Sequence, residues 1–171
     1  MAIVAIVPDK LGAALSRLQR ELDPEAPMPP HIPLVAPFVA QPPFLPLERH
    51  CWRTGHESPP FWVELGELEL NGEAPFVRLP VRSGGEQLAA LRDALLASEH
   101  VLAEGDASGP RAFAARLSHR GDLAISKFDE PGAGAGHRTF LLERFELMTQ
   151  YPDGSWYERD FYTLDRTVAR T

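Results

Sequence analysis

The stretch Pro29-Pro-His-Ile-Pro-Leu-Val-Ala-Pro-Phe38 decides how the rest of the chain is interpreted. Its prolines and β-branched residues favour an extended backbone, so we predict a strand over residues 31–38. Pro33 and Pro37 have no N–H to donate to a ladder. The strand is therefore expected at the edge of a sheet.

A strand and a helix are predicted before this stretch. Residues 3–7 form an apolar run that stops at Pro8, which is typical of a buried strand. Asp9 is expected to cap a helix that ends before Pro24. Apolar residues recur at helical spacing in this segment, at Leu11, Leu15, Leu18 and Leu22. The first part of the chain thus has the order strand, helix, strand.

The same order is predicted a second time, further along the chain. Asn71-Gly72 lies between the strand-like residues 65–70 and 76–81, which indicates an antiparallel hairpin. A helix is expected from Gly85, followed by a strand over residues 113–119.

The remaining segments complete an α+β pattern. A short helix is expected within residues 47–54 and a strand over residues 61–65. Two strands, over 139–148 and 156–164, are joined by the turn Tyr151-Pro-Asp-Gly154. The pattern predicts an α+β domain with a cleft between two related halves.

Composition limits the class of protein. The 171 residues, 44% of them hydrophobic, fit one compact domain over 1–171. Cys51 is the only cysteine, which favours a reducing, cytoplasmic setting. The apolar N-terminal run is too short for a signal peptide or a membrane span. A net charge of −7 disfavours a broad nucleic-acid surface but is compatible with a small anion pocket.

Residues 29–38 resemble the first signature of the 2H phosphoesterase superfamily, the group of bacterial 2′-5′ RNA ligases and 2′,3′-cyclic phosphodiesterases. That signature is His, any residue, Thr or Ser, then an apolar residue. His31 and Leu34 match it, whereas Pro33 occupies the hydroxyl position. The second signature corresponds to Phe113-Ala-Ala-Arg-Leu-Ser118, in which Arg116 replaces the second histidine and Ser118 keeps the hydroxyl.

The resemblance implies a fold and a set of site residues. The fold is two-lobed, with antiparallel sheets, helices packed outside and a central cleft. Residues two apart on a strand share a face, so each signature offers its side chains to that cleft. The resemblance implies a catalytic role for His31 and phosphate binding by Arg116 and Ser118. It implies no metal and no cofactor.

The two departures from the signatures bear on catalysis. Arginine stays protonated, so Arg116 cannot exchange a proton as histidine does, although its planar guanidinium suits phosphate. His119 is the alternative second histidine, but neighbours on a strand point to opposite faces. It would enter the cleft only through a bulge or a one-residue slip. His50, Cys51 and His56 lack a fourth ligand at a defined spacing, so we predict no metal site.

Three functions stay open at this point. The first is an enzyme acting on small 2′,3′-cyclic or 2′-5′ phosphodiesters, including RNA ends, with weak or lost catalysis. The second is a non-catalytic module that binds a nucleotide or a phosphorylated metabolite. The third is a protein interaction domain. Arg116 and Pro33 favour the second and third, whereas the context of His31 favours the first two. The sequence makes no prediction of oligomeric state.

Overall fold

The computed structural model describes residues 1–71, 76–101, 114–118, 138–165 and 167. Within these ranges three helices pack on antiparallel strands, which confirms the predicted α+β class. The elements are β1 (Ala2–Ile6), α1 (Asp9–Leu22), β2 (His31–Val35), α2 (Leu45–Glu57), β3 (Phe61–Leu65), β4 (Glu69–Asn71), β5 (Phe76–Ser83), α3 (Gly85–Leu96), β6 (Ala114–Ser118), β7 (Thr139–Leu142), β8 (Arg144–Gln150) and β9 (Trp156–Thr163).

The order strand, helix, strand occurs twice, as β1-α1-β2 and β5-α3-β6. The N-cap prediction for Asp9 is wrong, however. Pro8 holds the cap position in an extended conformation, and Asp9 lies in the first helical turn with φ 55°. The Gly12 N–H donates to the Pro8 carbonyl at 2.9 Å, so the helix begins without a side-chain cap. The Asp9 carboxylate still complements the positive end of the helix dipole.

The strands follow the order β7-β3-β5-β6-β2-β1-β8-β9, with β4 paired to β5. The described pairings are antiparallel, including the hairpin in which Asn71 lies opposite Phe76. The strand expected over residues 139–148 is two strands. β7 pairs with β3 and β8 with β1, because the chain changes partner at Glu143. The turn at residues 151–154 is confirmed, with Gly154 at φ 89°.

The prediction that the strand of His31 lies at a sheet edge is wrong. β2 is central, with β1 on one side and β6 on the other, and it ends at Val35 instead of Phe38. In the described residues the pairing of β2 with β6 is confined to His31 and Arg116. Pro33 therefore lies where no described bond to β6 requires its missing N–H, which explains why a central strand tolerates it.

The sheet has two faces of different character. Alternate residues such as Ile3, Ala5, Ile32 and Leu34 enter the main core with buried residues of all three helices. The intervening residues lie on the opposite face, where Ala2, Val4, Met28 and Met148 form a small cluster. We call this opposite side the second face. His31 and Pro33 alternate with the buried Ile32 and Leu34, so they belong to the second face.

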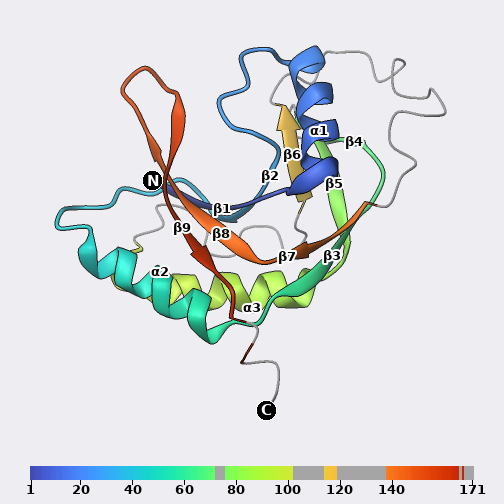
Figure 1. Ribbon diagram of the computed structural model, residues 1–171. Coiled ribbons are helices and arrows are strands. Elements are labelled where there is room, and N and C mark those ends of the chain that lie inside the picture. Colours follow the sequence, from blue (N-terminus) through green and yellow to red (C-terminus); the bar gives the residue numbers. More distant parts are fainter. Residues whose placement is uncertain (72–75, 102–113, 119–137, 166, 168–171) are drawn as a thin grey trace.

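The helices pack crosswise between the two repeats (Figure 1). α1, from the first repeat, lies against β6 of the second, and α3, from the second repeat, packs on β2 of the first. Each central strand is therefore supported by the helix of the other repeat. In the described part of the chain, no helix is both long and apolar enough to span a membrane.

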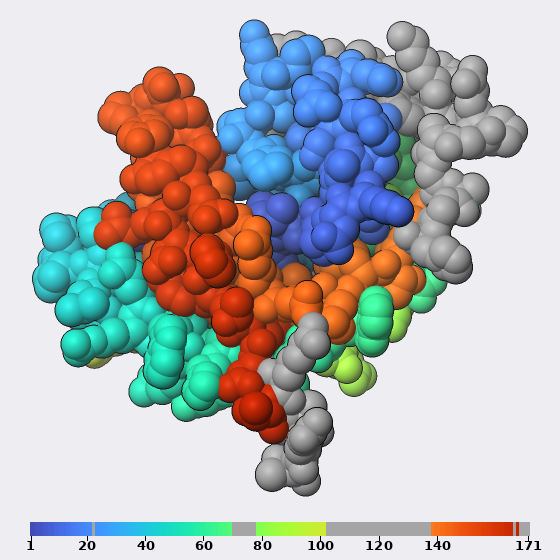
Figure 2. All heavy atoms as spheres, viewed as in Figure 1, coloured from blue at the N-terminus to red at the C-terminus, as the bar shows by residue number. Residues whose placement is uncertain are grey.

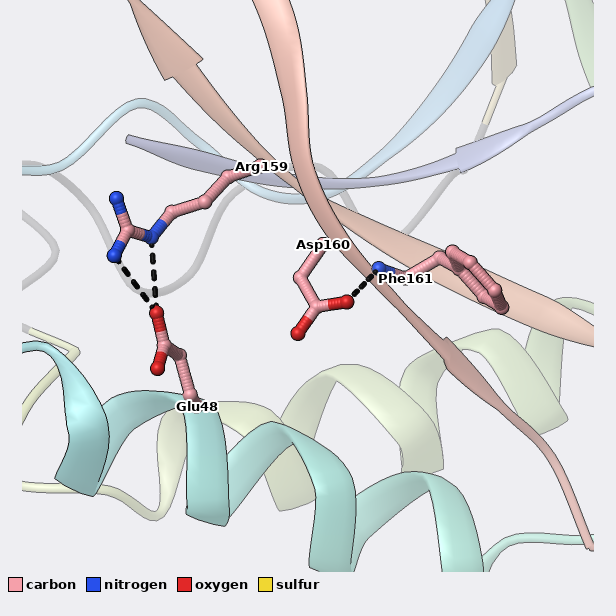
Figure 3. Close-up of polar contacts among 4 residues, drawn as sticks. All are labelled: Glu48, Arg159, Asp160 and Phe161. Carbon is pink, nitrogen blue, oxygen red and sulfur yellow. Dashed lines mark hydrogen bonds and ion pairs between the residues drawn. The ribbon is translucent and has the colours of Figure 1, made fainter.

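α2 is fixed against β9, and the two segments form adjoining surface in the space-filling view (Figure 2). Arg159 of β9 donates to Glu48 Oε1 at 3.0 and 2.8 Å (Figure 3). The neighbouring Asp160 carboxylate accepts the Phe161 N–H at 2.9 Å. On the inner side of α2, burial, with the charges of Asp160 and Glu48, raises the pKa of the Cys51 thiol to about 12. Cys51 is thus a core residue and a poor nucleophile.

Candidate functional site at the junction of β2 and β6

The structure places His31 directly opposite Arg116 in the β2–β6 pairing. The strands that carry the two signatures, β2 and β6, are neighbours in the sheet. Direct partners in an antiparallel pair share a face, and their Cβ atoms are separated by about 4.5–5.5 Å. Positions 31 and 116 therefore meet on the second face, at the centre of the sheet.

His31 is held in a defined orientation. Its Nδ1 lies 2.8 Å from the Pro29 carbonyl oxygen. A carbonyl oxygen only accepts, so Nδ1 carries the hydrogen and donates it. In the neutral ring the lone pair is then on Nε2. The half-buried His31 thus has the tautomer that a general base requires at Nε2.

Arg78 is a site residue that the sequence analysis missed. It lies on β5 directly opposite Arg116, so positions 78, 116 and 31 form one row across three strands. Its Nη2 is 3.7 Å from Glu69 Oε2. Among the described residues, its buried Nε has no hydrogen-bond partner. Only the β5–β6 register reveals this neighbour, and no local motif in the sequence marks it.

The position of the missing hydroxyl is also defined. Pro33 lies opposite Val4 on β1, and Val4 in turn lies opposite Glu146 on β8. Pro33 is half-buried and on the same face as His31, as the signature requires of that position. Position 33 therefore faces the same side as a signature hydroxyl would, but the pyrrolidine ring of Pro33 supplies no hydrogen-bond donor.

The β5–β6 register bears on Ser118 and His119. Ser118 lies opposite Val77, while Arg116 lies opposite the next residue, Arg78, so the register shifts by one residue at Leu117. The alternation of faces is not regular through such a bulge. The shared face expected for positions 116 and 118 therefore does not follow from their spacing alone. His119 lies outside the described residues, so its role as the alternative second histidine stays a prediction.

Glu146 is a buried acid on the second face. It is 4% exposed, and its Oε1 lies 3.0 Å from Arg144 Nη2. Burial, together with the nearby carboxylate of Glu158, raises the pKa of Glu146 despite the opposing effect of Arg144. Its place one row from His31 was not apparent from the sequence, because β8 is far from β2 along the chain.

The two histidines considered as metal ligands have separate partners. His50 Nε2 contacts the carbonyl oxygens of Ala94 and Leu95, and His56 Nδ1 lies 3.0 Å from Asp165 Oδ2. Cys51 is buried. Within the described ranges, no group of three or more histidine, cysteine or acidic residues has a geometry suited to a metal.

Comparisons with known proteins give the family of this chain. The family model described as the 2′-5′ RNA ligase superfamily matches residues 7–114. This range includes His31 and stops just before Arg116. A search of curated protein sequences found no match.

Solved structures show the same fold. Escherichia coli LigT in its apo form is 16% identical, with a TM-score of 0.66, and the alignment covers 95% of each chain. TT0787 of Thermus thermophilus is 19% identical, with a TM-score of 0.61, over 96% of this chain and 97% of that one. A structure described as a phosphoesterase is 16% identical, with a TM-score of 0.66, over 95% and 96%. The family match covers more than half of the chain, and the chain therefore belongs to the 2′-5′ RNA ligase superfamily.

Proposed function

We propose that this protein binds small 2′,3′-cyclic or 2′-5′ phosphodiesters, including those at RNA ends, and hydrolyses them slowly. The observation that carries the proposal is the direct pairing of His31 with Arg116 at the centre of the sheet. An imidazole and a guanidinium at this separation suit one phosphodiester group. In this proposal the cleft lies on the second face, within one domain that needs no metal or cofactor.

His31 is assigned the proton transfer. With its hydrogen on Nδ1, the ring accepts a proton at Nε2 from the attacking water as the new P–O bond forms. The bond to the leaving ribose oxygen breaks, and that oxygen takes its proton from solvent, since an arginine at 116 does not release one. His31 then releases the proton on Nε2 to solvent and is neutral again. Loss of one general acid typically costs about 10²- to 10⁴-fold in rate, which is why turnover is expected to be slow.

Arg78 and Arg116 are assigned to binding the phosphate group of the ligand. Arg78 and Arg116 lie in one row with His31, and guanidinium groups make short, charge-assisted hydrogen bonds to phosphoryl oxygens. The buried, unpartnered Nε of Arg78, within the described part of the chain, is a donor that such an oxygen would satisfy. Ser118 is assigned a further hydrogen bond to the same group.

The class of ligand agrees with what similar structures contain. Escherichia coli LigT has been crystallised with NADP⁺, with 3′-AMP, with ATP and with phosphate. Each of these carries a phosphate group, and three carry a nucleoside. For this chain, they support a small nucleotide-like ligand. The cytoplasmic location that we propose rests instead on Cys51 being the only cysteine.

A non-catalytic module for nucleotides or phosphorylated metabolites is the second candidate. Arg116 and Pro33 favour it, because they keep a cation for phosphate while removing an imidazole and a hydroxyl. A protein interaction domain is the remaining alternative, and it predicts no binding of phosphate-bearing ligands on the second face.

One experiment separates these functions. Adenosine 2′,3′-cyclic phosphate is incubated with wild-type protein, His31→Ala and Arg116→Ala, and hydrolysis is followed by chromatography while binding is measured by calorimetry. We expect slow turnover that His31→Ala abolishes and binding that Arg116→Ala weakens by about tenfold or more. Arg17→Ala, at an exposed position of α1, is the control.

The outcomes point in different directions. Binding that depends on Arg116 without any turnover supports the binding module. Neither binding nor turnover, in protein shown to be folded, rejects both functions and leaves the interaction domain.

A further inference from the structure

A hollow on the outer surface lies between α2 and the chain that follows α3. Its volume is about 840 Å³, and its lining includes Arg49, His50, Trp52, Arg53, Glu99 and His100. This size falls within the range of small-molecule sites, about 300–1,000 Å³. α2 and α3 bury their inner sides in the main core, whereas His31 lies on the second face. The hollow is therefore separate from the β2–β6 site.

The lining carries two arginines and one acid, Glu99, so its formal charge is positive in a protein of net charge −7. Glu99 Oε1 lies 3.7 Å from His100 Nε2. Arg49 and Arg53 are one turn apart on α2, and both are exposed. Like charges at this spacing destabilise a helix by about 0.2–0.5 kcal/mol. Glu48, the adjacent acid, is engaged by Arg159 (Figure 3). Among the described residues, no carboxylate forms an ion pair with Arg49 or Arg53.

His50 connects the two walls and orients one arginine. Its Nε2 lies 3.1 Å from the carbonyl oxygens of both Ala94 and Leu95, so Nε2 donates to the last turn of α3. Its Nδ1 lies 3.4 Å from Arg53 Nη2. Since a guanidinium only donates, Nδ1 accepts from Arg53 in this arrangement. The position of Arg53 is thus tied to the end of α3.

An exposed aromatic ring completes the lining. Trp52 is 63% exposed, and one side of its indole stacks on His56 with 5.2 Å between ring centroids and 10° between planes. Exposed tryptophan beside unneutralised arginines is a combination that binds nucleotides, because the ring stacks on the base while the guanidinium groups bind the phosphate.

We propose that this α2–α3 hollow is a second binding site, which takes a nucleotide through Arg49 and Arg53 at the phosphate and Trp52 at the base. The nucleotide is either free or one unit of a single-stranded RNA. His50 is a positioning residue for Arg53. The site is independent of turnover at His31.

The test uses the full-length His31→Ala/Arg116→Ala protein, in which the proposed β2–β6 site is disabled. AMP is titrated by calorimetry, with adenosine and inorganic phosphate as partial ligands. We expect one AMP site, with adenosine and phosphate each binding at least about tenfold more weakly. Adding Arg49→Ala/Arg53→Ala should weaken AMP binding by at least about tenfold, and Trp52→Ala by a similar factor.

The control is Arg17→Ala/Arg20→Ala, which removes the same charge from exposed positions of α1. Unchanged AMP affinity in the Arg49→Ala/Arg53→Ala protein, or an equal loss in the control, overturns the proposal. Phosphate binding as tightly as AMP also overturns it, since the base would then contribute nothing. A four-nucleotide RNA that binds at least as tightly as AMP identifies a strand as the source of the nucleotide, and weaker binding of the RNA identifies a free nucleotide.

Discussion

His31 and Arg116 are direct partners across β2 and β6, although most of the described chain lies between them in sequence. Each belongs to a separate strand-helix-strand repeat, so the repeats meet at this pair. In the proposed function both side chains reach one phosphate.

Arg116→His should increase the hydrolysis of 2′,3′-cyclic nucleotides by about 10²-fold, because it restores an imidazole that exchanges a proton near neutral pH. The pH profile should become bell-shaped, since one imidazole must be neutral and the other protonated. Initial rates across pH 5–9 measure both effects. His31→Ala in the Arg116→His protein should remove the gain.

Pro33→Thr should raise the rate further in the Arg116→His protein, because it restores a hydroxyl on the second face. The substitution also frees a constrained backbone, so the melting temperature is measured first. A well-folded double variant that is no faster than its parent would favour the binding module over the enzyme.

Arg78→Ala should weaken phosphate and nucleotide binding at the β2–β6 site by about tenfold, because it removes a cation next to Arg116. Arg82→Ala, on the same strand but outside the row, is the matched control and should change affinity little. The measurement is calorimetric titration with phosphate. An equal loss of phosphate affinity in the two variants would show that removing any positive charge from β5 has this effect, and would contradict a specific role for Arg78.

The stability of Glu146→Gln relative to wild type should be greater at neutral pH than at acid pH. Burial raises the pKa of Glu146 above the ordinary 4.5, so the folded state holds its proton where the unfolded chain has released it. Stability from this group is complete below 4.5 and is lost as pH rises through the folded pKa. The Tm difference between variant and wild type should therefore grow from pH 4 to pH 8. A difference that shrinks with pH would contradict the sign.

Gly84→Ala should destabilise the protein more than Gly154→Ala does. Both glycines have positive φ, 88° and 89°, so each alanine costs about 1–2 kcal/mol in backbone strain. A Cβ at Gly84 would also lie 2.5 Å from the Trp62 carbonyl oxygen, whereas one at Gly154 meets nothing within 4 Å. Urea unfolding of both variants measures the difference in the free energy of unfolding. Equal losses of stability would mean that the β3 backbone at Trp62 shifts to make room for a Cβ at position 84.

Much of the fold was predictable from local patterns. Helical spacing located α1 and α3, and the turn residues located the β8–β9 hairpin, because these signals depend on a few neighbouring residues. The edge assignment of β2 failed because it rested on Pro33 and Pro37, and Pro37 lies beyond the end of β2 at Val35. A proline excludes only the bonds that its own N–H would make, and the described β2–β6 pairing does not use that group.

The site was only partly predictable for a related reason. His31 and Arg116 were found through the resemblance to two signatures, which implied that both side chains serve one cleft but not that they are direct partners in the sheet. Arg78 and Glu146 join them through register and strand order, which are set by long-range packing and not by any local pattern. The one-residue shift at Leu117 was equally invisible in the sequence.

The crosswise packing of α1 on β6 and of α3 on β2 has a consequence for folding. The main helix packing of each central strand comes from the other repeat, so we expect neither repeat to acquire a complete core before the other has formed. We expect the two repeats to unfold in a single cooperative transition. Folding should be slow for a chain of this length, because the contacts that complete each core join residues far apart in the sequence.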